Sequence, residues 1–420
     1  MCLHTPFFCS LYHKVSCLTR QMILFFFTLA LIGCATEKKM PSNAQGFILS
    51  ANQEITKAGE NTFQNGGNAA DAMSAMLMSG AVLLPSRMGL GAGGICQVLD
   101  PAEARVKTLD FLSRPMSFDK QIGIPALAKG VYTLQNKYGL KPWAEILQNP
   151  IQKAQNGVKV SDMLAKDILS TTGLDSSWKN LKKGDVLTQP KLAKTLKTLS
   201  SKGAGVLYKG KIADSIVSQS TQIISQDLKN FKVSFMDSID VTTPFAKTYF
   251  PNPTILSSDG YMIWRNATSD KEARQQKAKE DMIALQNRTF DNQTKGISLI
   301  AADKNGLVIV CNVSMGSAFG STQLTEEGFY LAQTIKHTDM PVVFANILQT
   351  NPDITDMTTA VAGVENYALL GALNELSDKD DAENIGSDSL ISMTCEKGYP
   401  NHASSCAENE NLHFVFSKID

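Results

Sequence analysis

Residues 60–100 read ENTFQNGGNAADAMSAMLMSGAVLLPSRMGLGAGGICQVLD, a stretch that passes from a helical pattern through a glycine-rich turn into a strand. Asn68 and Asp71 have the N-cap and third-position pattern that begins a helix, with aspartate in place of the usual glutamate. The apolar residues that follow lie on more than one side of the helix, so the sequence predicts a helix buried on more than one face. These residues are Ala69, Ala72, Met73, Met76, Leu77 and Val82.

The glycines between Gly89 and Gly94 predict a tight turn that permits close packing of backbones. A phosphate-binding loop is the alternative interpretation. However, the segment lacks the lysine of that motif, and it precedes a strand where a dinucleotide-binding loop would follow one. The tight turn is therefore the better interpretation.

Strand-like and helix-like patterns alternate along the rest of the chain. GFILSA at residues 46–51 predicts a short strand, whereas residues 125–150 and 158–200 are mostly helical in pattern. Residues 266–292 mix acids and bases, which predicts an exposed helix with a linker and not a nucleic-acid patch.

A β-hairpin is the strongest local signal in the chain. Residues 297–315 read ISLIAADKNGLVIVCNVSM, in which two β-rich runs flank the turn Asn305-Gly306. We find neither an internal repeat nor a low-complexity tract that would suggest another architecture.

The composition is that of a globular protein without a large excess of charge. The 420 residues are 43% apolar and 19% charged, and 40 basic residues balance 40 acidic ones. This balance argues against a basic footprint for nucleic acid, so we expect no nucleic-acid partner. The chain has five histidines and neither an HExxH nor a CxxC motif, so we expect no metal site and no cofactor.

The N-terminus has the pattern of an export signal. The apolar run at residues 22–33, MILFFFTLALIG, is too short to span a bilayer, and Lys14 and Arg20 supply positive charge before it. The run ends in LIGC, which resembles a bacterial lipobox, and in such signals the cysteine is lipidated. That cysteine is Cys34.

The lipobox predicts a signal peptide over residues 1–33, a lipid anchor at Cys34 and a linker over residues 34–45. We therefore expect an exported protein of the bacterial periplasm, attached to the outer membrane through its lipid. An ordinary secretory signal with a chance cysteine is the alternative. Met22 is a second candidate for the first residue.

Cysteine usage agrees with export. Cys395 and Cys406 close a short polar loop, CEKGYPNHASSC, and in an oxidising compartment they are expected to form a disulfide. Cys96 and Cys311 lie within apolar, strand-like runs and are expected to be small buried hydrophobic residues.

Five blocks of the chain resemble the gamma-glutamyltranspeptidase family and occur in the family's order. The first contains the GGNA-DA helix and glycine-rich strand entry of the family's N-terminal signature. In the second, LDFLSRP resembles the family's D-F-R-E-x-A-P segment, and in the last the hairpin resembles the start of the small subunit. The blocks are residues 60–100, 109–115, 124–168, 192–233 and 297–321.

The resemblance implies an α+β fold with the four-layer αββα architecture of N-terminal-nucleophile hydrolases. It implies a large-subunit-like region, residues 46–293, and a small-subunit-like region, residues 294–420, in one combined catalytic domain. The family is made as a precursor that cleaves itself before a threonine, and the processed pieces stay associated. The new N-terminal threonine attacks a gamma-glutamyl amide such as glutathione. Its α-amine is the base, because an α-amine titrates near neutrality.

Thr294 is the preferred nucleophile by this resemblance, with cleavage after Gln293, because Thr294 and Ser298 then fit the family's T-x-x-x-S pattern. The fit requires two extra residues in the hairpin, which preserve strand parity. An ungapped count instead puts Gly296 at the nucleophile position, where it cannot attack a carbonyl. Two alternatives stay open: Thr294 is an ordinary polar residue, or Ser298 is the nucleophile after cleavage at Ile297.

Four further residues acquire roles from the resemblance. Gly363 stands where the family has a Gly-Gly oxyanion loop, and the substrate-binding residues are Arg114, Gln333 and Ser314. Arg114 comes later in its block than the arginine that clamps the substrate α-carboxylate, but an arginine side chain is long and suits bidentate binding of a carboxylate.

Other family positions are altered. Gly316 replaces an asparagine, and Val343 and Phe344 replace two serines. Each polar group of a substrate left unsatisfied in a buried site costs about 1–3 kcal/mol. The alternative to an enzyme is therefore a catalytically inactive, unprocessed envelope lipoprotein that uses the same scaffold as a binding or structural module.

Overall fold

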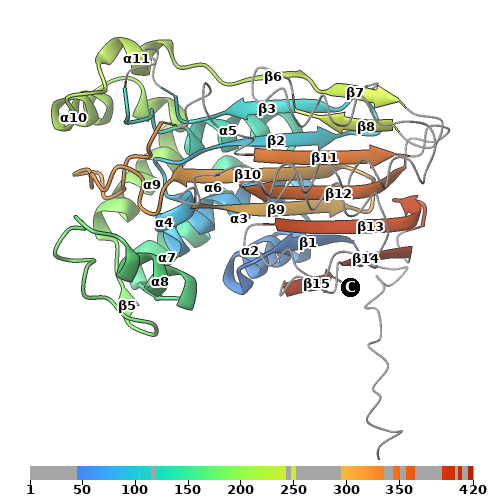
Figure 1. Ribbon diagram of the computed structural model, residues 1–420, viewed down its shortest axis with the longest axis horizontal. Coiled ribbons are helices and arrows are strands. Elements are labelled where there is room, and N and C mark those ends of the chain that lie inside the picture. The colour runs from blue at the N-terminus through green and yellow to red at the C-terminus, as the bar shows by residue number, and fades with distance from the viewer. Residues whose placement is uncertain are drawn as a thin grey trace, which may run out of the picture. The chain divides into compact units, whose positions relative to one another are not determined.

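The computed structural model shows the second of two compact units into which the chain divides, Met1–Lys38 and Lys39–Asp420 (Figure 1). The lipobox with Cys34 and the expected helix at residues 266–292 lie outside the described residues. The residues described are 45–103, 105–114, 120–242, 247–251, 295–334, 344–350, 356–364, 390–402, 405–408 and 415–419.

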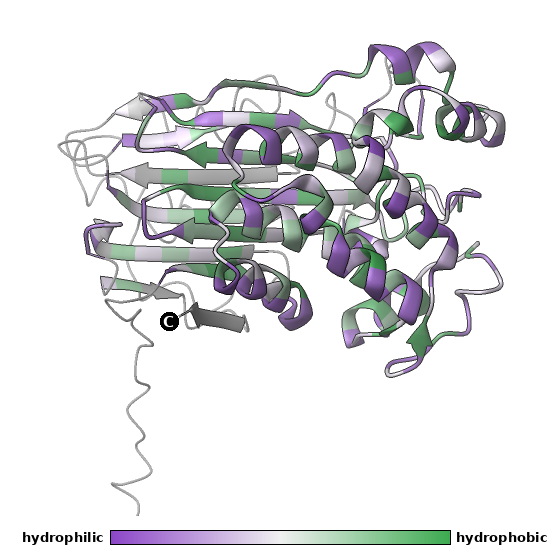
Figure 2. Cartoon of the chain, turned by 180° about the vertical axis from the view of Figure 1, so that it is seen from behind, coloured by the Kyte–Doolittle hydropathy of each residue, from purple (hydrophilic) through white to green (hydrophobic). Residues whose placement is uncertain are grey.

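Helices of the described residues pack on one face of a seven-stranded sheet (Figures 1 and 2). None of the helices in this part of the chain has the length and apolar character needed to cross a bilayer. The helices are α2 (Gln53–Gln64), α3 (Ala69–Leu83), α4 (Pro85–Met88), α5 (Leu127–Tyr138), α6 (Trp143–Ile146), α7 (Gln148–Asn156), α8 (Asp162–Ser170), α9 (Pro190–Lys202), the 3₁₀ helix η1 (Ala204–Leu207), α10 (Lys211–Gln219) and α11 (Ser225–Asn230).

Helix α3 is the buried helix that the sequence predicts. The Asn68 side chain accepts hydrogen bonds from the N–H groups of Ala70 and Asp71, and the Asp71 carboxylate accepts one from the Asn68 N–H, which completes the capping box. Every residue of α3 is buried, as expected for a helix that is apolar on several faces. Both predictions are confirmed.

The helical prediction for residues 158–200 is only partly correct. The short strand β4 (Val158–Lys159) precedes α8, and turns with the short strand β5 (Val186–Leu187) separate α8 from α9. Thr171, the C-cap of α8, is extended, and Gly173 and Gly184 in the turns that follow adopt φ of 79° and 89°, which a continuing right-handed helix does not allow. The apolar spacing alone did not reveal these breaks.

The predicted hairpin is also confirmed, and its strands lie at the centre of the seven-stranded sheet. Strands β9 (Lys295–Asp303) and β10 (Val308–Gly316) pair antiparallel, and Gly306 in the turn has φ of 90°. The order of this sheet is β15-β1-β9-β10-β2-β3-β6. Its other strands are β1 (Gly46–Ser50), β2 (Gly93–Leu99), β3 (Lys107–Phe111), β6 (Ser234–Asp237) and β15 (Val415–Ile419).

A second antiparallel sheet packs against the face of the first that the helices leave free. Its order in the described residues is β14-β13-β12-β11-β8-β7. The strands are β7 (Ile239–Thr242), β8 (Lys247–Phe250), β11 (Phe344–Thr350), β12 (Met357–Val364), β13 (Leu390–Tyr399) and β14 (Cys406–Glu408).

Alternation along the central strand separates two apolar cores. In β9, Ile297 and Leu299 lie in the core beneath the helices, whereas Ile300 and Ala302 lie in the core between the sheets. Successive residues of a strand point to opposite faces, so one strand serves both cores. The layer order in the described residues is therefore helices, sheet, sheet.

The described residues contain two disulfides, of which the sequence predicted one. Cys395 and Cys406 are joined across β13 and β14, as their spacing led us to expect. The prediction for Cys96 and Cys311 was wrong in one respect: both are fully buried, but they are bonded to each other. They stand opposite each other on β2 and β10, a pairing across 215 residues that local patterns do not reveal.

Asp71 does more than cap α3, and we expect Asp71→Ala to lower the free energy of unfolding by about 3 kcal/mol. Its buried carboxylate also accepts hydrogen bonds from the Gln135 side chain at 2.6 Å and from the Leu140 and Lys141 N–H groups. The variant would leave these donors unsatisfied. Urea unfolding is the measurement, with Asp175→Ala as the control because Asp175 is exposed and its carboxylate accepts hydrogen bonds from the nearby Ser177 N–H and hydroxyl. Equal losses in the two variants would contradict this role.

Candidate functional site

Four strand ends meet at one edge of the seven-stranded sheet. In register, Lys295 at the start of β9 pairs with Gly316 at the end of β10, and Ser314 of β10 pairs with Gly93 at the start of β2. Gly94 in turn pairs with Phe111 at the end of β3. Because neighbouring antiparallel strands run in opposite directions, these ends share one edge. Of the predicted site residues, Ser314 lies near the end of β10 and Arg114 follows the end of β3.

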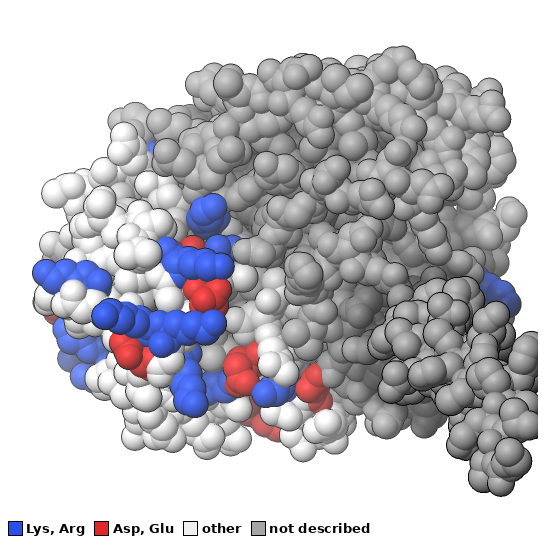
Figure 3. All heavy atoms as spheres, turned by 60° about the horizontal axis from the view of Figure 1, so that its bottom comes forward, with Lys and Arg blue, Asp and Glu red and all other residues white. Residues whose placement is uncertain are grey.

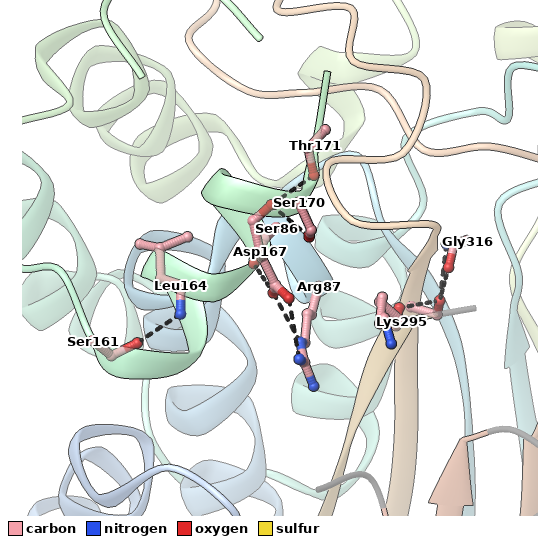
Figure 4. A network of polar contacts seen from close by, with 10 residues as sticks. Ser86, Arg87, Ser161, Leu164, Asp167, Ser170, Thr171, Lys295 and Gly316 are labelled. Carbon is pink, nitrogen blue, oxygen red and sulfur yellow. Dashed lines mark hydrogen bonds and ion pairs between the residues drawn. The ribbon is translucent and has the colours of Figure 1, made fainter. Parts of the chain in front are cut away.

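Ser314 holds the start of β9. Its hydroxyl donates a hydrogen bond to the Lys295 carbonyl at 2.6 Å and accepts one from the Gly316 N–H at 2.8 Å (Figure 4). A β-bulge lies between Ser314 and Gly316, and Gly316 has φ of 84°, which a glycine adopts without strain. Thr294 precedes Lys295 in the chain and lies outside the described residues. The Ser314 hydroxyl thus fixes the residue that follows the predicted nucleophile.

Gln333 lies beside the same bulge. Its N–H donates to the Met315 carbonyl at 2.9 Å, and a Cβ on Gly316 would stand 2.8 Å from the Gln333 Cβ. The Gln333 residue is exposed, so its amide is accessible to a ligand at this edge.

Arg114 follows the end of β3, but its guanidinium already has an anionic partner. It forms an ion pair with Asp110, whose carboxylate also accepts a hydrogen bond from the Leu112 N–H at 3.0 Å. The side chains of Arg114 and Asp110 are 31% and 13% exposed. A substrate carboxylate would therefore have to compete with Asp110 for Arg114.

Gly363 belongs to the second sheet, at the end of β12. It pairs with Ala345 of β11 and Leu390 of β13, and its carbonyl accepts a hydrogen bond from the Asn312 side chain at 2.8 Å. Asn312 is fully buried on β10, two residues before Ser314. This bond joins the candidate oxyanion residue to the strand that carries Ser314.

Asn312 is the site residue that the sequence analysis missed. Alternation was the available signal, because Asn312 and Ser314 interrupt an apolar strand at positions that share one face. Ser298 lies directly opposite Asn312 on β9 and is buried. The Ile297–Ser298 bond therefore lies within a paired strand, where the sequence analysis expected it.

The glycine-rich turn brings backbones close together at this edge, as predicted. A Cβ on Gly93 would lie 2.0 Å from the Ser113 nitrogen, and one on Gly91 would lie 2.1 Å from the Tyr330 carbonyl oxygen. No side chain fits at either position, so close packing alone accounts for the glycines.

Helix α4 supports the loop that follows β10. The Ser86 carbonyl accepts a hydrogen bond from the Phe319 N–H at 2.8 Å, and Phe319 has an uncommon φ of 60°. The next residue, Arg87, forms a buried two-point ion pair with Asp167 of α8 at 2.9 and 3.1 Å (Figure 4). The Ser86 hydroxyl also donates to Asp167 at 2.7 Å. The ion pair therefore anchors the support of a loop at the candidate site.

A metal cluster does not mark another site in the described residues. No group of three or more His, Cys, Asp or Glu side chains there is placed to hold a metal ion. Figure 3 shows acidic side chains between the basic ones on the described part of one face. On α8, Asp162 pairs with both Lys166 and Lys183.

Comparisons with known proteins identify relatives of the chain. A family model described as gamma-glutamyltranspeptidase matches residues 55–260. A glutathione hydrolase proenzyme of Pseudomonas aeruginosa is 29% identical over a 255-residue alignment, which covers 52% of this chain and 45% of the relative. One of Escherichia coli strain K12 is 30% identical over a 226-residue alignment, which covers 45% of this chain and 39% of the relative. The match spans less than half the length of these relatives.

A solved structure covers more of the chain. The crystal structure of cephalosporin acylase from Bacillus halodurans covers 79% of each chain with a TM-score of 0.61 at 16% identity. The likeness shows the fold, and the prediction of an α+β N-terminal-nucleophile hydrolase fold is confirmed.

Proposed function

Because the chain belongs to the gamma-glutamyltranspeptidase family, with its match over residues 55–260, we propose that it is a self-processed threonine-nucleophile hydrolase or transferase. Its proposed substrates are gamma-glutamyl amides such as glutathione. The observation that carries the proposal is the hydrogen bond from Ser314 to the Lys295 carbonyl, which fixes the start of β9. Arg114 follows β3 of the same sheet, and Gly363 is bonded to Asn312 of β10, the strand that carries Ser314. These residues come from segments far apart in the sequence.

Self-cleavage would create the nucleophile. The Thr294 hydroxyl attacks the Gln293 carbonyl carbon, the peptide C–N bond breaks, and Gln293 is held as an ester on Thr294. Water then hydrolyses the ester, which leaves a carboxylate on Gln293 and a free α-amine on Thr294. The bond from Ser314 to the Lys295 carbonyl favours this step because it fixes the backbone next to Thr294.

The free threonine would then act on substrate. Its α-amine takes the hydroxyl proton while the hydroxyl oxygen attacks the gamma-glutamyl carbonyl carbon, and the leaving amine receives the proton. Water or an acceptor amine next removes the glutamyl group from the ester. Backbone N–H groups near Gly363 are the proposed oxyanion donors, with the Asn312 side chain holding the Gly363 carbonyl.

The proposed setting is the bacterial periplasm, with attachment to the outer membrane through a lipid on Cys34. The two disulfides support export, because such bonds persist in oxidising compartments. The two processed pieces would stay together as one catalytic domain.

A non-catalytic binding module on the same scaffold is the second candidate. Two specific observations favour it: Arg114 is paired with Asp110 within the chain, and Gly316 offers no side chain where the family has an asparagine. Such a module would bind its ligand without turnover.

Turnover of paired glutamyl anilides distinguishes these functions. The purified mature chain is incubated with gamma-glutamyl and α-glutamyl p-nitroanilide, and release of nitroaniline is followed. We expect hydrolysis of the gamma isomer only, because the free α-amino and α-carboxyl groups would occupy the Arg114 end of the site. No release from either isomer after prolonged incubation would contradict the enzymatic function.

Asp110→Asn tests whether Arg114 binds substrate. We expect KM for the gamma-glutamyl anilide to fall by roughly two- to fivefold, ~0.5–1 kcal/mol, because Arg114 loses its competing carboxylate. The asparagine side-chain oxygen can still accept the bond from the Leu112 N–H. The matched control is Asp237→Asn, which removes a surface partner of Lys107 and Arg105 and should leave KM unchanged. A rise in KM would instead mean that Asp110 has to hold Arg114 in place.

A further inference from the structure

The two pieces on either side of the proposed cut are interleaved in the first sheet. The hairpin β9–β10 belongs to the C-terminal piece and lies between β1 and β2, which belong to the N-terminal piece. Strand β15 of the C-terminal piece pairs with the other side of β1. In the second sheet, β11 of the C-terminal piece pairs with β8 of the N-terminal piece. A cut anywhere between β8 and β9 leaves all of these pairings in place.

The Cys96–Cys311 disulfide joins two paired strands that belong to different pieces. Cys96 lies on β2, Cys311 lies opposite it on β10, and both are fully buried in the core beneath the helices. The Cys395–Cys406 bond lies wholly within the C-terminal piece. Among the described cysteines, the first disulfide is thus the bond that joins the two pieces.

We infer that the processed protein is one covalent two-chain molecule, in which Cys96–Cys311 links the pieces after the cut at Thr294. The inference rests on the proposed function for the cut, and on the sheet order and the disulfide for the link. The link makes reassociation of the pieces an intramolecular event, so the catalytic domain does not come apart on dilution. It also hides self-cleavage from any denaturing measurement made without a reductant.

The test uses a cut that does not depend on self-processing. The recognition sequence of a site-specific protease is inserted before residue 294 in the Thr294→Ala chain, which is exported, purified and cut. The sample is denatured in the presence of a maleimide to block thiol exchange, and its intact mass is measured with and without a phosphine reductant. We expect one species without the reductant, heavier than the uncut chain by one water, and two species with it.

Paired cysteine variants identify the bond. Cys96→Ser with Cys311→Ser should give two separate pieces without the reductant, whereas Cys395→Ser with Cys406→Ser should still give one. Should the first pair fail to fold, peptide mapping of the native-cysteine chain decides: without the reductant, maleimide should label neither Cys96 nor Cys311. Two separate pieces from the native-cysteine chain without reductant, or maleimide on either residue, would overturn the inference.

The unmodified chain separates this inference from the proposed function. If it stays whole even with the reductant, self-processing fails while the engineered cut still reports on the link. If it gives two pieces without the reductant, self-processing stands and the covalent link fails.

Discussion

Thr294→Ala should lose gamma-glutamyl turnover by a factor on the order of 10³ or more, because the variant lacks the attacking oxygen in both self-cleavage and substrate hydrolysis. It should also remain a single chain, since the same hydroxyl performs the first step of processing. Release of nitroaniline and the mass of the reduced, denatured protein measure the two effects. No general base or oxyanion donor can replace a missing nucleophile, so we expect this to be the largest kinetic effect of any single substitution.

Two other substitutions serve as a control and as a test of the alternative nucleophile. Thr172→Ala changes an exposed threonine beyond α8 and should leave processing and turnover as in the unmodified chain. Ser298→Ala changes the buried residue of β9 opposite Asn312 and should lower turnover without preventing cleavage before Thr294. Full turnover by Thr294→Ala, together with no turnover by Ser298→Ala, would show that Ser298 and not Thr294 is the nucleophile.

Asp167→Ala should lower the free energy of unfolding by about 3–5 kcal/mol, the largest stability loss we expect from a single substitution. The Arg87 side chain is 10% exposed and would be left as a buried charge without its carboxylate. The Ser86 hydroxyl loses the same acceptor. Because α4 also supports Phe319, the loop after β10 should lose order together with the ion pair. Urea unfolding followed by circular dichroism measures the loss.

Asp162→Ala is the matched control on the same helix. Asp162 pairs with Lys166 and Lys183, but its side chain is 54% exposed, and exposed ion pairs contribute little to stability. We therefore expect little change in its unfolding midpoint. A loss in Asp167→Ala no greater than that in Asp162→Ala would show that the buried pair is not an anchor.

Local chemistry is what the sequence predicted well. Two features depend on residues only a few positions apart, so a single sequence is enough to recognise them. They are the capping box of Asn68 and Asp71 and the Asn305-Gly306 turn. The Cys96–Cys311 bond could not be predicted from the sequence, because it depends on which strands, 215 residues apart, become neighbours in the sheet. Burial of both cysteines was correctly predicted, since that follows from their apolar surroundings.

The candidate site shows the same division. The resemblance to the family predicted Ser314 and Gln333 as site residues, and both lie at the edge of the sheet where β10 ends. Two features escaped prediction: the ion pair of Arg114 with Asp110 and the bond from Asn312 to the Gly363 carbonyl. Each depends on how side chains turn after the strands are assembled, and the second joins two different sheets.

Self-processing at Thr294 is tested by the intact mass and N-terminal sequence of the mature wild-type chain, denatured and reduced after prolonged incubation. We expect two pieces, of which the smaller comprises residues 294–420 and begins at Thr294. A single undivided chain would contradict self-processing and leave the binding module as the function of this scaffold.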